Sequence, residues 1–352
     1  MFSPSPLPRN LEASFRDLGS QRVATRVSAI RDVVRHSLRS DVTRARAIPE
    51  LEKALREDPS ADVRVGAAVA LADVAAREAL AVLLVAVEDE DANVRQMALS
   101  ALGEIADPRA APRLERALSD DRPEVRYQAV IAFARVAKDD GAAVATALAR
   151  ALDDPDGAIR YIAMRVAEER LAIEADSEPL RAEAMAASAE QLVDDPDDAL
   201  AVVSALYLAR LGRPRGRAIV LDVVAERRGT PELEDEQACV ELAGELPLDD
   251  AIPHLERRAW GARRVVRALL SWGAGDGASC AWHARIALAR MGHERARAEI
   301  LADLASWRRE TREAAVVAAG RARIREARNL LESLGESVDA ALVREALVRL
   351  AV

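Results

Sequence analysis

Apolar residues recur in the first half of the chain with the spacing of an amphipathic helix. Four segments, each opening on a branched apolar residue followed by arginine, superpose without gaps, and their arginines stand 31, 31 and 34 residues apart. Within a copy the apolar residues fall at positions 0, +4, +7, +8 and +11, which is one face of a helix with about 3.6 residues per turn. The fourth copy, from Ile159, follows the pattern until its last position, where Arg170 stands. The first three copies are Val63, Ala67, Ala70, Leu71 and Val74, then Val94, Ala98, Ala101, Leu102 and Ile105, then Val125, Ala129, Ala132, Phe133 and Val136.

A second helix is predicted before each of these, so that the repeating unit is a helical hairpin. Its opening recurs at residues 47–52, 110–115 and 251–256 as A-I-P-E-L-E, A-A-P-R-L-E and A-I-P-H-L-E. Proline is tolerated in the first turn of a helix because the amide that it lacks has no intrahelical acceptor there. We therefore expect each of these helices to begin near its proline. Acidic turns such as D-P at 58–59 and D-D-P at 153–155 separate the two helices of a hairpin.

The chain resembles the HEAT-repeat family, in particular the bacterial form also known from phycobilisome lyases. The resemblance rests on the stretches A-I-P-x-L-x-x-A-L, D-x-x-V-R and A-L-G-E-I-x-D-P-R-A, the last of which stands at residues 101–110. It is close at residues 47–170 and weaker afterwards. It implies an all-α fold, a right-handed α-solenoid of about nine to ten HEAT-like helical hairpins.

This fold predicts a simple domain organisation. We expect a flexible tail at residues 1–10 and a single solenoid at residues 11–352. The solenoid would hold regular repeats at 47–170, divergent acidic repeats at 171–250 and irregular repeats containing Trp and Arg at 251–352.

The repeated arginines are expected to be structural. The family resemblance implies that they pair with acids in the turns and form a ladder between adjacent hairpins. The arginines are Arg64, Arg95, Arg126 and Arg160, and the acids are residues such as Asp62, Asp91, Asp121 and Asp156.

Composition agrees with an all-α protein. Half of the 352 residues are hydrophobic but only 3% are aromatic, so the core must consist mainly of Ala, Leu and Val. Cys239 and Cys280 have no CxxC pair or His cluster beside them, which predicts buried thiols and no zinc site. No stretch approaches the ~18 consecutive apolar residues of a membrane helix. We therefore expect a soluble, cytoplasmic protein with no membrane partner.

Charge is distributed unevenly along the chain, whose formal net charge is −9. Residues 171–250 hold 7 arginines against 19 acidic residues, whereas residues 251–352 hold 18 against 12. Such blocks are usually solvated faces, but the acidic segment could instead orient a basic protein or peptide. Association between copies of the chain through the two oppositely charged segments is a further possibility.

All four tryptophans lie between residues 260 and 307, beside a group of arginines. A glycine-rich loop at 273–277 and an extra helix at 262–272 are predicted to interrupt a hairpin here. Insertions in solenoids map to loops, commonly on a binding face, and Trp with Arg is enriched at interface hot spots. The alternative is that the tryptophans fill the larger core of an irregular repeat. The candidate partner-binding residues are Trp260, Arg263, Arg264, Arg267, Trp272, Trp282 and Trp307.

The predicted function is a non-catalytic scaffold or adaptor that binds a partner protein along the concave surface of the solenoid, without a cofactor. The single His-Glu pair, His293-Glu294, superposes on the inter-repeat turn at 106–110, so a di-metal hydroxylase site is not expected. A bilin-lyase-like accessory factor is an alternative because the repeat type is shared. A HEAT-like DNA glycosylase or other nucleic-acid-binding protein is another, which only the basic, Trp-containing segment supports.

Overall fold

The computed structural model describes residues 10–74, 77–174, 179–261 and 276–351. These residues form helices and connecting turns, and no strand is found among them. The chain divides into two compact units, Met1–Glu169 and Arg170–Val352. The boundary falls inside a long helix, α10, at the point where the regular repeats end in the sequence.

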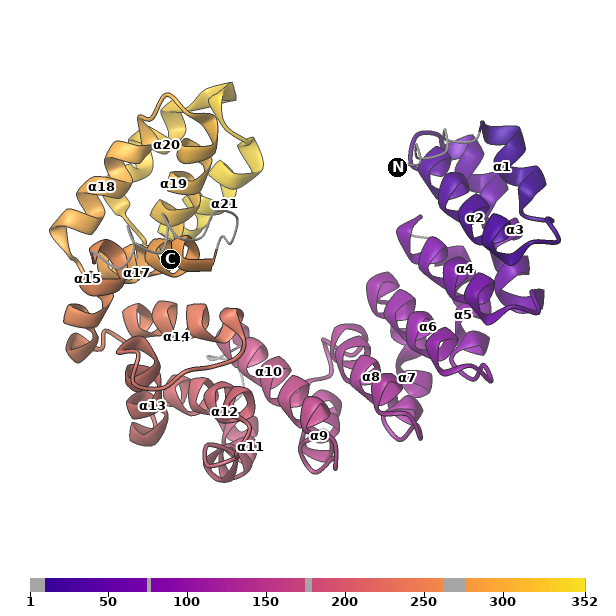
Figure 1. Ribbon diagram of the computed structural model, residues 1–352. Coiled ribbons are helices and arrows are strands. Elements are labelled where there is room, and N and C mark those ends of the chain that lie inside the picture. The colour runs from indigo at the N-terminus through magenta and orange to yellow at the C-terminus, as the bar shows by residue number, and fades with distance from the viewer. Residues whose placement is uncertain (1–9, 75–76, 175–178, 262–275, 352) are drawn as a thin grey trace, which may run out of the picture. The chain divides into compact units, whose positions relative to one another are not determined.

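Unit 1 is a stack of helical hairpins (Figure 1, indigo to magenta). Its helices are α1 (Leu11–Asp17), α2 (Val23–Ser37), α3 (Asp41–Glu57), α4 (Ala61–Asp73), α5 (Leu80–Ala86), α6 (Ala92–Ile105), α7 (Ala111–Ala117), α8 (Pro123–Val136), α9 (Gly141–Leu152) and α10 (Gly157–Glu174). Short 3₁₀ helices at Arg77–Ala79 and Pro108–Ala110 lead into α5 and α7. The second helices of successive hairpins, α2, α4, α6 and α8, pack against one another in that order.

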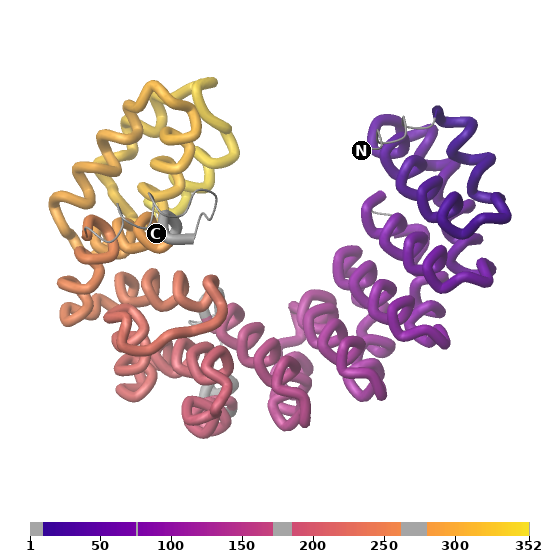
Figure 2. Tube along the Cα trace, in the orientation of Figure 1, coloured from indigo at the N-terminus to yellow at the C-terminus, as the bar shows by residue number. Residues whose placement is uncertain are grey.

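Unit 2 continues with hairpins of the same kind. Its helices are α11 (Pro179–Leu192), α12 (Asp198–Arg210), α13 (Pro214–Val224), α14 (Leu233–Glu245), α15 (Ile252–Trp260), α17 (Asp276–Arg290), α18 (Glu294–Leu304), α19 (Arg309–Arg321), α20 (Arg328–Ser333) and α21 (Ala340–Ala351). Short 3₁₀ helices lie at Asp249–Ala251, Arg325–Ala327 and Gly335–Ser337. The second helices α12, α14, α17, α19 and α21 form one packed layer, and the zigzag of successive helices is easiest to follow in the tube of Figure 2. The described helices thus pair into ten hairpins, which agrees with the expected nine to ten.

The predicted core face is confirmed. All fifteen apolar residues of the first three copies are buried, and none exposes more than 7% of its surface. Their helices are held together by contacts between small residues: a Cβ atom added to Gly103 on α6 would lie 3.1 Å from the Cα atom of Ala132 on α8. In unit 2 the Cβ of an alanine at position 244, on α14, would lie 2.5 Å from the Cα atom of Ala287 on α17. Adjacent second helices therefore pack backbone to backbone at these two glycines.

The prediction of where the first helices begin is right at two prolines and wrong at the third. Pro112 and Pro253 lie in the first turns of α7 and α15, as expected. Pro49 lies inside α3, which begins eight residues earlier at Asp41, because the side chain of Ser40 accepts a hydrogen bond from the Thr43 amide and caps a new helix there. The predicted extra helix at 262–272 lies outside the described residues, and the last two residues of the predicted glycine loop, 276–277, belong to α17.

Candidate partner-binding surface

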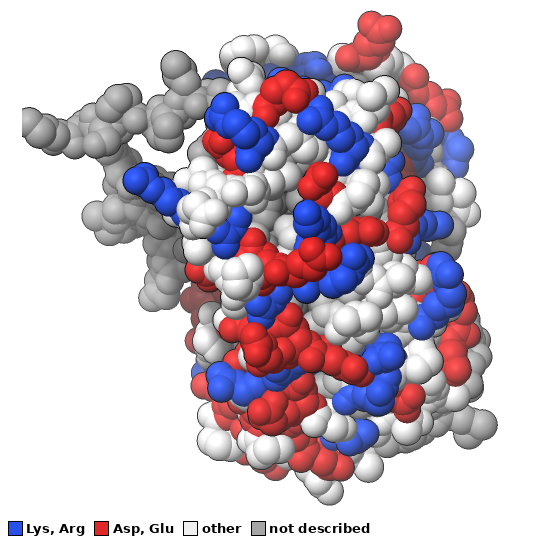
Figure 3. Space-filling view, turned by 90° about the vertical axis from the view of Figure 1, so that its right-hand side faces the viewer, with Lys and Arg blue, Asp and Glu red and all other residues white. Residues whose placement is uncertain are grey.

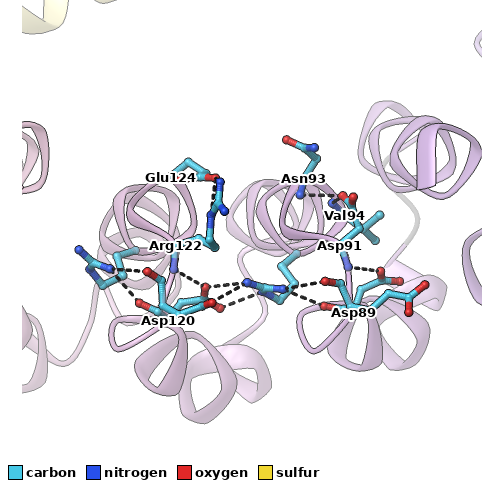
Figure 4. Close-up of polar contacts among 11 residues, drawn as sticks. Asp89, Asp91, Asn93, Val94, Asp120, Arg122 and Glu124 are labelled. Carbon is cyan, nitrogen blue, oxygen red and sulfur yellow. Dashed lines mark hydrogen bonds and ion pairs between the residues drawn. The ribbon is translucent and has the colours of Figure 1, made fainter.

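An arginine–aspartate ladder connects the hairpins of unit 1. Each arginine lies at the fifth residue of a second helix, counted from the N-cap, and reaches a carboxylate in the turn of the next hairpin. Figure 4 shows two of these carboxylates, Asp89 and Asp120, with the hydrogen bonds that they accept. The ladder includes the pairs Arg26–Asp58, Arg64–Asp89, Arg95–Asp120 and Arg126–Asp154, with N–O distances of 2.7, 2.8, 2.8 and 2.8 Å.

Each rung also connects to the next one. The same arginine donates to the backbone carbonyl of the aspartate in its own turn: Arg95 bonds the Asp89 carbonyl at 3.0 Å, and Arg126 bonds the Asp120 carbonyl at 2.9 Å. The Asp120 carboxylate accepts a further hydrogen bond from the Arg122 amide at 3.0 Å. The ladder therefore satisfies the polar groups of the turns and of both charged partners.

The predicted ladder exists at Arg64, Arg95 and Arg126, but its carboxylates are mostly not the expected ones. The fourth expected arginine, Arg160, donates to the carbonyls of Asp154 and Pro155. Asp91 and Asp156 accept hydrogen bonds from amides at the starts of α6 and α10, so they cap their own helices. Asp62 lies in the first turn of α4. Of the acids that the sequence suggested, Asp121 does contact a ladder arginine, Arg95 at 3.0 Å, from an exposed position beside the buried rung.

The ladder changes its chemistry in unit 2. The equivalent position, four residues after the N-cap, is Ala201 on α12 and Glu236 on α14. Glu236 accepts from Arg258 on α15 at 2.5 Å, and Arg258 also donates to two carbonyls at the end of α13. On α19 the position is Arg312 again, and it bonds the carbonyl of Ser337 at 2.8 Å.

The three described tryptophans of the candidate set lie in different places. Trp260, at the end of α15, is partly buried against the core. Its indole Nε1 donates to Glu299 on α18 at 2.9 Å, and the Arg295 guanidinium lies 4.1 Å from the ring centroid. Burial raises the pKa of Glu299, but the hydrogen bonds from Trp260 and Arg295 outweigh it and hold that pKa below the ordinary value. Trp260 therefore joins two first helices of the stack.

Trp282 lies on α17, in the layer of second helices. It packs partly buried on the core and contacts the ring of His283 edge-on, with 4.9 Å between centroids. The Arg321 guanidinium of α19 lies 5.6 Å from the indole centroid and pairs with Glu241 of α14 at 2.7 Å. His283 reaches the same Glu241 carboxylate at 3.2 Å. Glu241, Trp282, His283 and Arg321, here called the Trp282 patch, thus connect three adjacent second helices.

Trp307 stands in the turn between α18 and α19, where 83% of its surface is exposed and Arg308 lies 4.8 Å from the ring centroid. The tryptophans therefore divide between the first-helix layer, the second-helix layer and a turn. Of the other candidates, Arg263, Arg264, Arg267 and Trp272 lie outside the described residues.

A pocket of about 270 Å³ opens beside Trp282, between α17, α18 and α19. No local sequence pattern indicates this Trp282 pocket, because its walls come from three helices and Trp282 is its only lining residue among the sequence-based candidates. Its lining combines apolar residues with one arginine, a threonine and two acids. The lining residues are Trp282, Arg285, Ile286, Ile300, Asp303, Glu310, Thr311, Ala314, Ala315 and Ala318.

The histidines have structural surroundings. His293 is the N-cap of α18, and its Nε2 atom lies 3.1 Å from Glu256, in agreement with the predicted inter-repeat turn. Burial and then the nearby arginines lower the pKa of His254. Among the residues that the structure describes, no group of three or more His, Cys, Asp or Glu side chains could hold a metal ion. Cys239 and Cys280 are buried and unbridged.

Charges of both signs are mixed on the face of unit 1 seen in Figure 3, which views the molecule from the right-hand side of Figure 1.

Within the described residues, no helix has both the length and the apolar composition needed to cross a membrane.

Residues 48–134 match the family described as HEAT repeats, which confirms the resemblance over the regular part of unit 1. No curated protein is significantly similar to the chain. Among solved structures, the complex of CpcE and CpcF of phycocyanin lyase from Nostoc sp. PCC7120 shares 19% identity, with 72% of this chain and 96% of that chain covered and a TM-score of 0.43.

One designed protein and one engineered protein are similar to a comparable degree. A designed armadillo repeat protein in complex with the peptide (KR)4 shares 20% identity over 57% of this chain and 99% of that chain, with a TM-score of 0.44. An engineered protein shares 19% identity over 97% of this chain and 98% of that chain, with a TM-score of 0.43. At these identities the likeness concerns the fold and not a function.

Proposed function

We propose, from the premise that residues 48–134 of this chain are HEAT repeats, that the protein is a non-catalytic scaffold that binds another protein. The proposed contact surface is the layer of second helices in unit 2, centred on the Trp282 patch. The observation that carries the proposal is the Trp282 pocket, in which an indole, small apolar side chains and charged groups meet at one opening.

The chemistry of this surface suits protein recognition. Interface hot spots are enriched in Trp and Arg, and a partly buried aromatic ring next to a preformed pocket is the usual form of an anchor site. Ion pairs fix the side chains of the patch, because Glu241 contacts both Arg321 and His283. Further along α14, Glu245 contacts Arg210 at 2.8 Å and Arg290 at 3.1 Å. A partner would therefore meet side chains whose ordering entropy has already been lost.

The basic side chains of this layer favour a protein partner over nucleic acid. Nucleic-acid binding depends on arginines and lysines that can neutralise phosphates. Arg210, Arg290 and Arg321 are instead engaged with carboxylates of α14, and the chain carries a formal net charge of −9. We propose neither the nucleic-acid-binding nor the bilin-lyase alternative, because no contact among the described residues supports one of them specifically.

The test is site-specific photo-crosslinking in extract of the source organism, followed by reconstitution. A photoreactive amino acid replaces Ala314, an exposed residue of the pocket, and in a control protein it replaces Val85, an exposed residue of unit 1. We expect one protein to crosslink at position 314 and not at position 85, and the purified pair to form a stable complex.

The affinity of the reconstituted complex then shows whether Trp282 contributes to binding and Trp307 does not. Trp282→Ala should weaken binding by about 30-fold, which corresponds to the ~2 kcal/mol of a typical aromatic hot spot. Trp307→Ala removes the exposed tryptophan of the neighbouring turn and should leave the affinity within about twofold. Equal affinities of the Trp282 variant and the wild type would contradict the proposal.

A further inference from the structure

We infer that the Trp282 pocket accepts a lysine or arginine side chain of the partner protein. This inference rests on the proposed function and specifies the chemistry of the partner. It follows from three properties of the pocket: its charge balance, its aromatic wall and its apolar lining.

The charge balance of the pocket is negative. Asp303 and Glu310 both line it, whereas Arg285 is its only basic residue. The Arg285 Nη1 atom lies 3.8 Å from Glu299 and 3.9 Å from Asp303, so this single cation is shared between two carboxylates without a close contact to either. Within the described residues, no basic group lies within ion-pair distance of Glu310. A cation entering here would therefore find an incompletely neutralised carboxylate pair.

Arg285 itself indicates that the polar groups here are not fully matched. Its Nε atom is buried and has no hydrogen-bond partner among the described residues. A buried donor without an acceptor has a free-energy cost. Arg285 is therefore not held by a complete set of hydrogen bonds in this pocket.

The aromatic wall suits the same occupant. A guanidinium or ammonium over an indole ring is attracted by the ring's quadrupole, and Trp is the best of the aromatic residues for this contact. Unit 2 already holds such contacts, with Arg295 at 4.1 Å from the Trp260 centroid, Arg308 at 4.8 Å from the Trp307 centroid and Arg321 at 5.6 Å from the Trp282 centroid. Trp282 lines the pocket, so its indole is within reach of a bound side chain.

The apolar lining distinguishes a long side chain from a small cation. Ile286, Ile300, Ala315 and Ala318 offer nothing to a hydrated metal ion, but they cover the methylene groups of lysine or arginine. An acidic partner side chain would instead bring a third carboxylate beside Asp303 and Glu310. The occupant that satisfies the acids, the indole and the aliphatic lining together is a basic side chain with its aliphatic stem.

The experiment is a selection of random 12-residue peptides displayed on phage against the full chain, with binding of synthetic hits measured by fluorescence polarisation. We expect the hits to share one Lys or Arg whose replacement by Ala lowers the affinity at least tenfold. Asp303→Asn with Glu310→Gln should lower it by a similar factor, and so should raising the salt concentration from 0.05 to 0.5 M. The double change Glu332→Gln with Glu336→Gln, at exposed positions of the same unit, is the control for this change in net charge, and Glu332→Lys with Glu336→Lys is the control for charge reversal.

Reversing the charge of the pocket is the more discriminating test, because it predicts a change in which peptides are selected. The variant Asp303→Lys with Glu310→Lys should select peptides enriched in Asp or Glu, whereas the control double variant should select the original basic peptides. Thermal melts confirm that each variant is folded. Hits that lose binding with Trp282→Ala but carry no required basic residue would overturn the inference and leave the proposed function standing. Hits that bind Trp282→Ala as tightly as wild type, or an absence of hits, would overturn both.

Discussion

The ladder predicts that a single rung stabilises unit 1 far more than an exposed ion pair does. The perturbation is Arg95→Met, which keeps the aliphatic stem and removes the guanidinium. Arg95 donates to the Asp120 carboxylate at 2.8 and 2.9 Å and to the Asp89 carbonyl at 3.0 Å. The two side chains are 13% and 14% exposed, so the pair is largely but not fully removed from water.

The magnitude follows from this burial. Breaking a fully buried pair costs about 3–5 kcal/mol because the remaining charge loses its partner. The residual exposure, and the hydrogen bond that the Arg122 amide still donates to Asp120, reduce the expected loss of stability to about 2–3 kcal/mol. Since unit 1 spans Met1–Glu169, each kcal/mol corresponds to about 2–4 °C, and the melting midpoint should fall by about 5–10 °C.

The assay is thermal unfolding of the full chain followed by far-ultraviolet circular dichroism and calorimetry. All four tryptophans lie in unit 2, so their fluorescence reports separately on that unit. Arg122→Met is the matched control, because its pair with Glu124 is exposed and should contribute less than about 0.5 kcal/mol.

A double variant, Arg95→Met with Asp120→Asn, tests whether the loss is due to the pair. The asparagine can still accept from the Arg122 amide, and no buried charge remains, so the double variant should be more stable than the sum of the two single changes by at least about 1 kcal/mol. An Arg95→Met midpoint within 2 °C of the Arg122→Met midpoint would refute the reasoning, and so would strict additivity.

Three further predictions use the same melts. Gly244→Ala should destabilise unit 2 by about 2 kcal/mol or more, because its Cβ atom would lie 2.5 Å from the Cα atom of Ala287, and an unchanged midpoint would contradict the backbone contact. Gly66→Ala should stabilise unit 1 by about 0.5–1 kcal/mol, because the nearest atom outside its own helix is 3.7 Å away and alanine favours the helix; a lower midpoint would show that the space is not there. Burial raises the pKa of Asp120 and of Asp154, but the arginine and amide hydrogen bonds outweigh it and leave both pKa values below the ordinary value of 3.8. The unfolded chain then binds more protons than the folded one below about pH 4–5, so the ladder's contribution should be complete at neutral pH and should be lost as the pH falls through the folded pKa values. A pH titration of stability that is equally steep in Arg95→Met and wild type would contradict this.

The sequence by itself determined the features that depend on local periodicity. The spacing of Val94, Ala98 and Leu102 specifies which face of a helix is apolar, and the turns around Asp120 specify where a hairpin bends. The fold class and the repeated core therefore followed from residues a few positions apart. The ladder was expected from the family resemblance, once the arginine had been found at a constant position in each copy.

Tertiary structure decided which residues meet across the stack. Arg95 pairs with Asp120, 25 residues further along the chain, because stacking brings the next turn beside its helix, whereas the nearer Asp91 is held by the amides of α6. The tryptophans, close in sequence, separate because Trp260 and Trp282 belong to different helix layers. The Trp282 pocket combines side chains from α17, α18 and α19. No local sequence pattern predicts this pocket, because its shape depends on how closely the small residues let neighbouring helices approach.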